Sequence, residues 1–97
     1  MERYNNFQDF LSSLEKGSEI DVSLYNYIGF NGVPEYRSYA QIESGKKVLK
    51  LPEHKCWIKD SEKRTLVKIE ALKELIEPLK VLKEIKDEMN LTIKYRA

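Results

Sequence analysis

The sequence predicts an α+β domain in which helices pack on one face of an antiparallel sheet. The first observation is the Asn31-Gly32 pair between two runs of alternating apolar residues, which is the strongest short-range signal for a β-hairpin. The second is the region after Glu70, where leucine and isoleucine recur every three or four residues, as in an amphipathic helix. The third is the same spacing near the N-terminus, at Phe7, Phe10, Leu11 and Leu14.

The remaining elements follow in order. An N-terminal helix over residues 5–16 should end at Gly17, and a hairpin over residues 22–42 follows it. A second turn at Ser44-Gly45 predicts a third strand over residues 48–51, which Pro52 interrupts because it has no N–H to donate. Residues 56–59 and 64–69 form another hairpin, or residues 64–69 begin the next helix.

A long C-terminal helix and a short closing strand complete the expected fold. Pro78 lies inside the helical pattern, where it would remove one backbone hydrogen bond. We therefore expect a kink near Glu74, or two helices with Pro78 opening the second. Residues 91–95 alternate and form the last strand. The expectation is thus an N-terminal helix, an antiparallel meander of three to four strands, a long helix and a short strand.

Composition indicates one soluble domain over residues 1–97. The 97 residues are 41% hydrophobic and 34% charged, with a formal net charge of +1. No apolar run approaches the roughly 20 residues of a membrane span. The N-terminus lacks the basic start and apolar stretch of a secretion signal, so we expect a cytoplasmic protein. The single cysteine, Cys56, excludes an internal disulfide and fits a reducing compartment.

The two strands of the first hairpin each have an apolar and a polar face, because side chains alternate along a strand. On the first strand, one side carries Val22, Leu24, Ile28 and Phe30, and the other side carries Tyr25 and Tyr27. On the return strand, Arg37 and Tyr39 lie opposite the face formed by Tyr36, Ser38, Ala40 and Ile42. We predict an apolar inner face and an outer face of tyrosines and an arginine.

That outer face is the candidate binding site. Flat rings beside cations stack unpaired bases and contact phosphates. The predicted nucleic-acid-binding residues are Tyr25, Tyr27, Arg37, Tyr39, Lys46 and Lys47, with Lys50 nearby. The alternative is that the tyrosines are ordinary strand residues, since cross-strand aromatic pairs stabilise sheets by themselves.

No other set of residues indicates a catalytic, metal or cofactor site. His54 and Cys56 are two residues apart, but a zinc site needs about four ligands, and a nucleophile pair needs an oxyanion hole and an orienting carboxylate that the sequence does not identify. The glycines form no phosphate-binding loop. We expect no enzyme, no metal and no cofactor, and we place Trp57 in the core.

The hairpin and the helix together resemble a known family. Residues 27–39 (YIGFNGVPEYRSY) are similar to the strand pair that approaches DNA in the positive cofactor four-type transcriptional coactivators. Residues 63–69, running into the helix of residues 70–90, resemble the strand that feeds the dimer helix of that family. The resemblance covers residues 20–90. It implies a dimer that binds single-stranded DNA through Tyr25, Tyr27, Arg37 and Tyr39, with Lys46 and Lys47 beside them.

Two functions follow from these observations. The first is a small dimeric protein, paired through its C-terminal helix, that binds single-stranded nucleic acid and acts in transcription regulation. The dimer is also expected because Ala71 and Val81 lie beside the main helix stripe and would form an extra apolar strip. The alternative is a protein-binding regulator or inhibitor of phage or virus type that docks on a host protein, since tyrosines are enriched at such interfaces.

Overall fold

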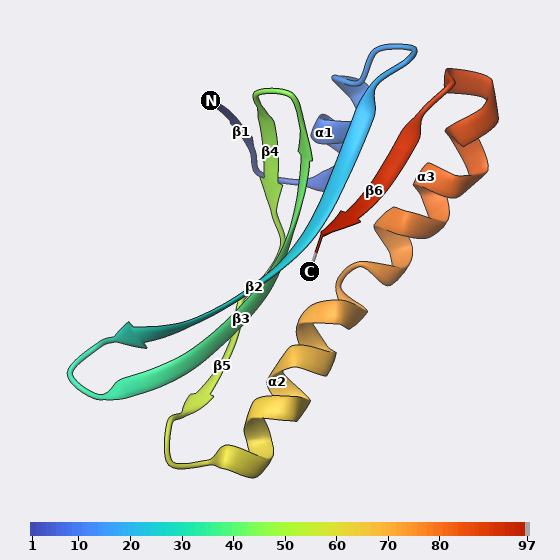
Figure 1. Ribbon diagram of the computed structural model, residues 1–97. Coiled ribbons are helices and arrows are strands. Elements are labelled where there is room, and N and C mark those ends of the chain that lie inside the picture. Colours follow the sequence, from blue (N-terminus) through green and yellow to red (C-terminus); the bar gives the residue numbers. More distant parts are fainter. Residues whose placement is uncertain (97) are drawn as a thin grey trace.

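The computed structural model describes residues 1–96 as a twisted sheet with three helices (Figure 1). The strands are β1 (Glu2–Tyr4), β2 (Glu19–Phe30), β3 (Pro34–Ser44), β4 (Lys47–Lys50), β5 (His54–Trp57) and β6 (Thr92–Arg96). The helices are α1 (Phe7–Ser12), α2 (Ser61–Lys73) and α3 (Ile76–Met89). The fold is therefore α+β, as the sequence predicts.

The sheet is mixed, which corrects the expectation of a purely antiparallel meander. Its strands follow the order β1-β4-β3-β2-β6, and β5 adds to β3 beyond the end of β4. The meander of β2, β3 and β4 is antiparallel, as predicted, but β1 pairs with β4 and β6 pairs with β2 in parallel. Parallel strands need a long crossover connection, and α2 and α3 supply one before β6.

The predicted hairpin has the predicted faces. Tyr25 lies opposite Tyr39 and Tyr27 lies opposite Arg37 in the β2–β3 register. The loop of residues 31–33 joins the strands, and Gly32 has a φ of 76°, a backbone conformation that favours glycine. Side chains directly opposite one another share a face of the sheet, so the tyrosines and Arg37 lie on one side.

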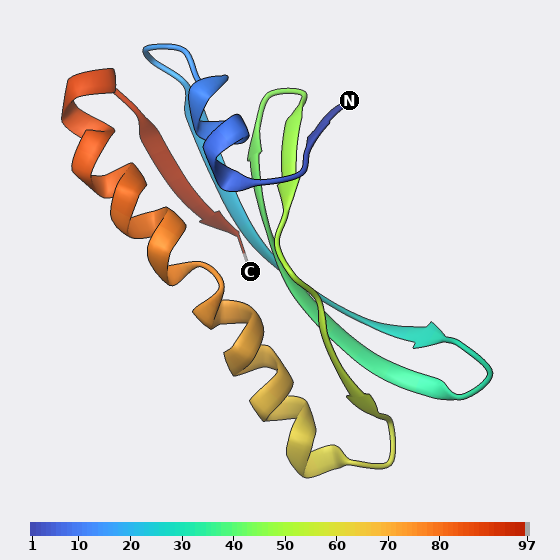
Figure 2. The same cartoon turned by 180° about the vertical axis from the view of Figure 1, so that it is seen from behind.

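All three helices pack against the opposite, apolar face of the sheet (Figure 2). The core includes Phe10 of α1, Ala71 of α2 and Leu82 of α3, each with no exposed surface. Phe10 and Leu82 belong to one hydrophobic cluster with the buried strand residues Ile20, Val22, Ala40, Ile42 and Leu49. Because Ala71 is fully buried, it does not form the exposed apolar strip that the sequence predicts for a helix-mediated dimer.

The C-terminal helical region divides into two helices near Pro78. α2 ends with Glu74 as its C-cap, and α3 begins at Ile76, so Pro78 lies in the first turn of α3. The first turn has no intrahelical acceptors for its N–H groups, and proline is tolerated there. Residues 64–69 belong to α2, so the alternative of a strand there, and with it the likeness to a strand feeding a dimer helix, is wrong.

The end of the hairpin extends beyond the core. The molecule measures 46 × 24 × 20 Å, and its radius of gyration of 14.8 Å exceeds the roughly 12.5 Å of a compact chain of this length. Ile28 and Phe30 lie on the apolar face but are 60% and 77% exposed, because α2 contacts β3 and β5 more than β2. Trp57 is 52% exposed, contrary to the expected core position.

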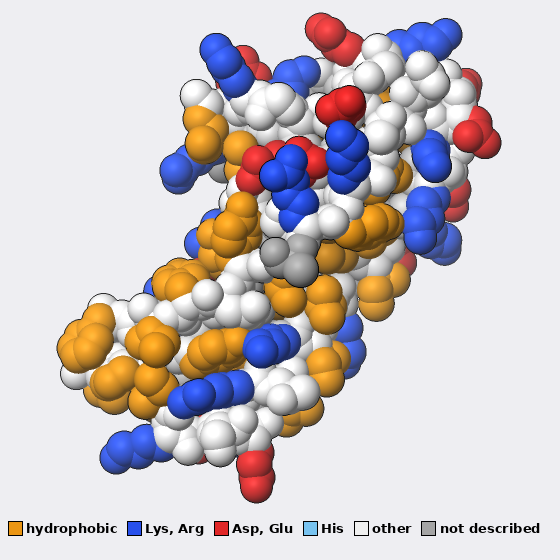
Figure 3. All heavy atoms as spheres, viewed as in Figure 1, with side chains coloured by type: hydrophobic (Ala, Val, Ile, Leu, Met, Phe, Trp, Pro, Cys, Tyr) orange, Lys and Arg blue, Asp and Glu red, His pale blue; other side chains and the backbone are white. Residues whose placement is uncertain are grey.

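Hydrophobic side chains gather over this arm of the hairpin and beside α2, whereas the surface around the start of β2 and β6 is charged (Figure 3). The exposed apolar residues include Val33 at the hairpin loop and Ile69 and Leu72 on α2. Among residues 1–96, no helix is both long and apolar enough to cross a lipid bilayer.

Candidate nucleic-acid interface

The rings of Tyr25, Tyr27 and Tyr39 contact one another on the sheet face that the helices leave open. We call these three residues the tyrosine cluster. Tyr25 and Tyr39 stack with ring centroids 5.3 Å apart, and the Tyr27 ring meets Tyr39 edge to face at 6.0 Å. Such pairs stabilise the sheet beyond their buried area. Tyr25 and Tyr27 remain 40% and 39% exposed, so their rings are both fixed and accessible.

Glu53, in the connection between β4 and β5, holds three of the surrounding side chains. The Tyr27 hydroxyl donates to its Oε2 at 2.5 Å, and Lys50 Nζ lies 3.2 Å from the same oxygen. Arg37 Nη1 lies 3.3 Å from Oε1. Pro52 ends the β4 ladder and so allows the chain to turn and place this carboxylate beside the cluster. Sequence patterns gave no signal for Glu53, because its partners lie on three other segments.

Charge and burial act in opposite directions on Glu53. Partial burial by itself would raise the pKa of its carboxyl group. Hydrogen bonds from Tyr27 and Lys50, with the charges of Lys50 and Arg37, outweigh burial and lower that pKa below the ordinary value of 4.5. Glu53 is therefore an ionised anchor at neutral pH.

Arg37 is neutralised within the protein. Besides Glu53, it pairs with Glu35 through Nη2 and Oε2 at 3.0 Å, and Glu35 is only 8% exposed. Hydrogen bonds to the Tyr27 and Glu35 side chains raise the pKa of Arg37. The guanidinium lies over Gly29, where a Cβ atom would come within 2.4 Å of Nε. Arg37 is on the predicted face, but two carboxylates share its charge.

Lys50 is the cation most closely associated with the rings. Its ammonium lies 4.2 Å from the centroid of Tyr39, a cation–π contact. Burial raises the pKa of the Tyr39 hydroxyl, and the positive charge of Lys50 partly offsets this. The tyrosine cluster and Lys50 thus form one aromatic and basic surface.

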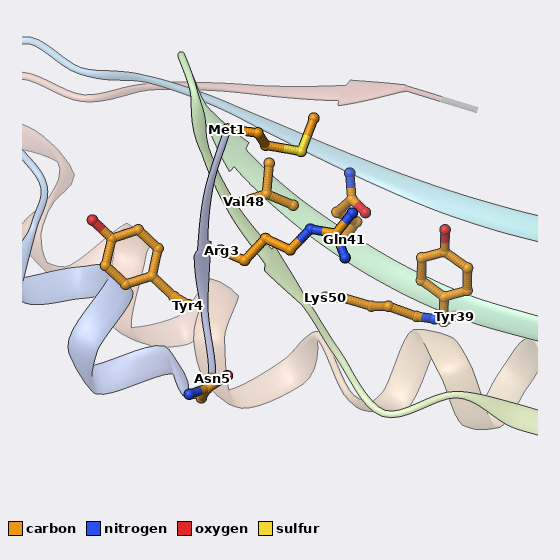
Figure 4. Close-up of a pocket in the computed structure, with 8 residues that line it drawn as sticks. All are labelled: Met1, Arg3, Tyr4, Asn5, Tyr39, Gln41, Val48 and Lys50. Atoms are coloured by element: carbon orange, nitrogen blue, oxygen red, sulfur yellow. The ribbon is translucent and has the colours of Figure 1, made fainter.

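A pocket of about 510 Å³ continues this surface toward β1 and β4 (Figure 4). Its lining comprises Met1, Arg3, Tyr4, Asn5, Tyr39, Gln41, Val48 and Lys50. The Arg3 side chain reaches across β4 toward Gln41, and Lys50 extends to Tyr39 (Figure 4). Within the described residues, no carboxylate pairs with Arg3. Arg3 was missed from the sequence because the β1–β4 pairing that brings it here was not foreseen.

The structure does not bring the two other predicted lysines to this face. Lys46 lies in the turn between β3 and β4 and is exposed. Lys47 donates to the backbone carbonyl of Ser13 after α1, on the helix side of the sheet. Successive side chains along β4 point to opposite faces of the sheet, and Lys47 and Lys50 are three positions apart. Lys50 therefore lies on the face of the tyrosines, and Lys47 lies on the opposite face.

His54 and Cys56 lie on the same face of β5, beside α2. His54 Nε2 lies 3.0 Å from Glu74 Oε1, which supplies a carboxylate that the sequence did not reveal. Both residues line an open surface hollow of about 270 Å³, and no hydrogen bond joins them to each other among the described side chains. No cluster of three or more metal-binding side chains occurs within residues 1–96.

Comparison with known proteins adds no functional assignment. The chain matches no protein-family model, no curated protein and no solved structure. The resemblance to single-stranded-DNA-binding coactivators therefore stays a hypothesis based on residues 27–39.

Proposed function

We propose that the open face of the sheet binds single-stranded nucleic acid. The observation that carries this proposal is the exposure of the Tyr25 and Tyr27 rings on a face that no helix covers. Lys50 lies beside these rings, and the pocket of about 510 Å³ lined by Arg3 continues from them. Aromatic rings next to a basic groove are the combination that binds unpaired bases without requiring a particular sequence.

The rings supply the stacking surfaces. The Tyr39 ring is already covered by Lys50 and by Tyr25. The rings of Tyr25 and Tyr27 are therefore the ones that receive bases. Glu53 fixes the Tyr27 ring through the phenol hydrogen bond, which reduces the loss of side-chain freedom on binding. Each base–ring contact of this type contributes about 1–3 kcal/mol.

Two cations supply the phosphate contacts. Arg3 has no carboxylate partner among the described residues, and Lys50 is half-exposed at the rim of the pocket. Arg37 acts differently. Lys50 shares Glu53 with it but stays half-exposed, whereas Arg37 lies between two carboxylates, Glu35 and Glu53, and is only 21% exposed; its role is to position Tyr27 and Glu53. We expect the nucleic-acid backbone to follow the pocket from Tyr39 toward Arg3.

Salt dependence tests the phosphate contacts. Binding of a labelled oligothymidylate should weaken as salt rises, with a slope in log–log form of about −1.4 for two phosphate contacts. Lys50→Ala should reduce this slope by about one contact, and Lys46→Ala is the matched control that removes the same charge away from the site. Equal effects of the two variants would refute the assignment of the site.

A protein partner is the second candidate. Two features favour it: carboxylates neutralise Arg37, and the hairpin exposes Phe30, Ile28 and Val33. Exposed aromatic side chains anchor protein interfaces. A protein recovered from lysate by the wild type and lost with Phe30→Ala, together with no oligonucleotide binding at low salt, would establish this candidate in place of the first.

A further inference from the structure

One edge of the hairpin has no partner strand. β2 pairs with β6 over residues 19–23 only, whereas it pairs with β3 as far as Phe30. Among residues 1–96, no strand pairs with the outer edge of β2 over residues 24–30. Its main-chain N–H and C=O groups on that side are therefore open to another strand.

This free edge lacks the features that prevent strand pairing. Residues 24–30 read LYNYIGF and contain no charged residue and no proline. Native edge strands are usually protected by lysine, proline, a bulge or a covering segment. The edge is also apolar on both faces, with Tyr25 and Tyr27 on the open face and Ile28 and Phe30 on the other.

We propose that a second copy of this chain pairs antiparallel with residues 24–30 of β2, forming a two-fold symmetric dimer. Antiparallel pairing of a strand with its own copy satisfies the same row of donors and acceptors on both edges, as an isologous interface requires. Because the segment carries no charge, the symmetry sets no like charges opposite each other. A charged partner would gain no electrostatic attraction at this edge.

The side-chain area at this edge is small, because the Tyr25 and Tyr27 rings stay on the open face. With about 200 Å² for a ring side chain, the exposed fraction of Phe30 amounts to roughly 150 Å² per copy. Ile28 and the main chain add to this, against the roughly 600–800 Å² per partner of a specific interface. We therefore expect a reversible dimer that depends on protein concentration.

Such a dimer joins the two hairpins into one continuous sheet. The tyrosine clusters of both copies then lie on the same face, on either side of the symmetry axis. This route differs from pairing through the C-terminal helices. The proposal does not depend on nucleic-acid binding, because it is tested with the protein alone.

Sedimentation velocity provides the test, over about 1–300 µM protein, a range chosen for an interface at the small end of the size scale. We expect the wild type to shift from monomer to dimer over this range. Ile28→Lys should lower the dimer fraction at the highest concentration at least about tenfold. Each of the two paired strands would then carry a charged lysine, which opposes edge-to-edge pairing. Leu66→Lys is the control, since Leu66 is 59% exposed on α2. Circular dichroism checks that both variants stay folded.

Spin labels distinguish this dimer from one formed by the helices. With Asn26→Cys in a Cys56→Ser background, labels in the two copies should lie within about 20 Å, because paired strands place opposing residues about 5 Å apart. A wild type that stays monomeric at every concentration, a dimer that Ile28→Lys leaves intact, or a much longer label distance would overturn the proposal.

Discussion

Glu53 connects the aromatic and the basic parts of the open face. It accepts a hydrogen bond from Tyr27 and pairs with both Lys50 and Arg37. A single carboxylate thus contacts one exposed ring and two cations. Its removal should affect both stability and binding, although it does not itself face a phosphate.

The first prediction concerns pH. The folded-state pKa of Glu53 is lowered, so its stabilisation is present above the ordinary pKa of 4.5 and is lost as pH falls through the folded value. At pH 7, Glu53→Gln should lower the free energy of unfolding by about 1 kcal/mol. Urea unfolding of both proteins should show this difference shrinking below pH 4.5. A difference that stays constant down to pH 3 would contradict it.

The second prediction concerns Gly29. A Cβ atom at this position would lie 2.4 Å from Arg37 Nε, so the Arg37 side chain must shift relative to Glu35, which is nearly buried and also pairs with Lys55 at 3.8 Å. Because a weakened hydrogen bond to a charged group costs about 1 kcal/mol or more, and Lys55 still pairs with Glu35, Gly29→Ala should destabilise the protein by about 1 kcal/mol. In an Arg37→Ala background the same substitution should have no such cost. Urea unfolding of the four proteins measures both effects.

The elements show which features a sequence pattern can specify. The hairpin, its two faces, the meander and the separation of the helices at Pro78 all follow from local rules: turn residues, alternation and the missing N–H of proline. β1 and β6 are three and five residues long, and their parallel partners are distant in sequence. No local pattern specifies such pairings, and the position of Arg3 depended on one of them.

The third prediction concerns the end of α3. Its C-cap, Asn90, has φ 53° and ψ 47°, and the Leu91 N–H bonds back to the Lys86 carbonyl at 2.9 Å. This left-handed conformation is costly for residues other than glycine and asparagine. Asn90→Ala should therefore lower the thermal midpoint by roughly 4–8 °C, equivalent to about 1 kcal/mol, and Asn90→Gly should not lower it. Equal midpoints for Ala and Gly would contradict the cap.

The fourth prediction concerns the start of the same helix. Pro78 lies in the first turn of α3, where its missing N–H leaves no hydrogen bond unmade. Pro78→Ala should therefore not raise the free energy of unfolding by the ~3 kcal/mol that removing an interior proline would give. Because Pro78 is buried, the loss of its ring should instead lower that free energy by about 1 kcal/mol. A gain of stability near 3 kcal/mol would show that the helix continues through Pro78.

The whole molecule places its helices on one side of a twisted sheet and leaves the other side and the hairpin arm uncovered. The tyrosine positions could be predicted from alternation in β2 and β3, whereas Lys50, Glu53 and Arg3 required the pairing of β4 with β3 and β1. The site is therefore a product of the tertiary fold. We propose separate roles for the two uncovered surfaces: nucleic-acid binding for the open face and pairing with a second copy for the β2 edge.

The most direct measurement of the central claim is the fluorescence anisotropy of a labelled single-stranded oligonucleotide at low salt, titrated with wild type, Tyr25→Ala and Tyr25→Phe. Tyr25→Ala should weaken binding by about 1–3 kcal/mol, the contribution of one stacked base, and Tyr25→Phe should bind like the wild type because it keeps the ring. No binding by the wild type, or equal binding by all three proteins, would contradict the claim that this face stacks bases.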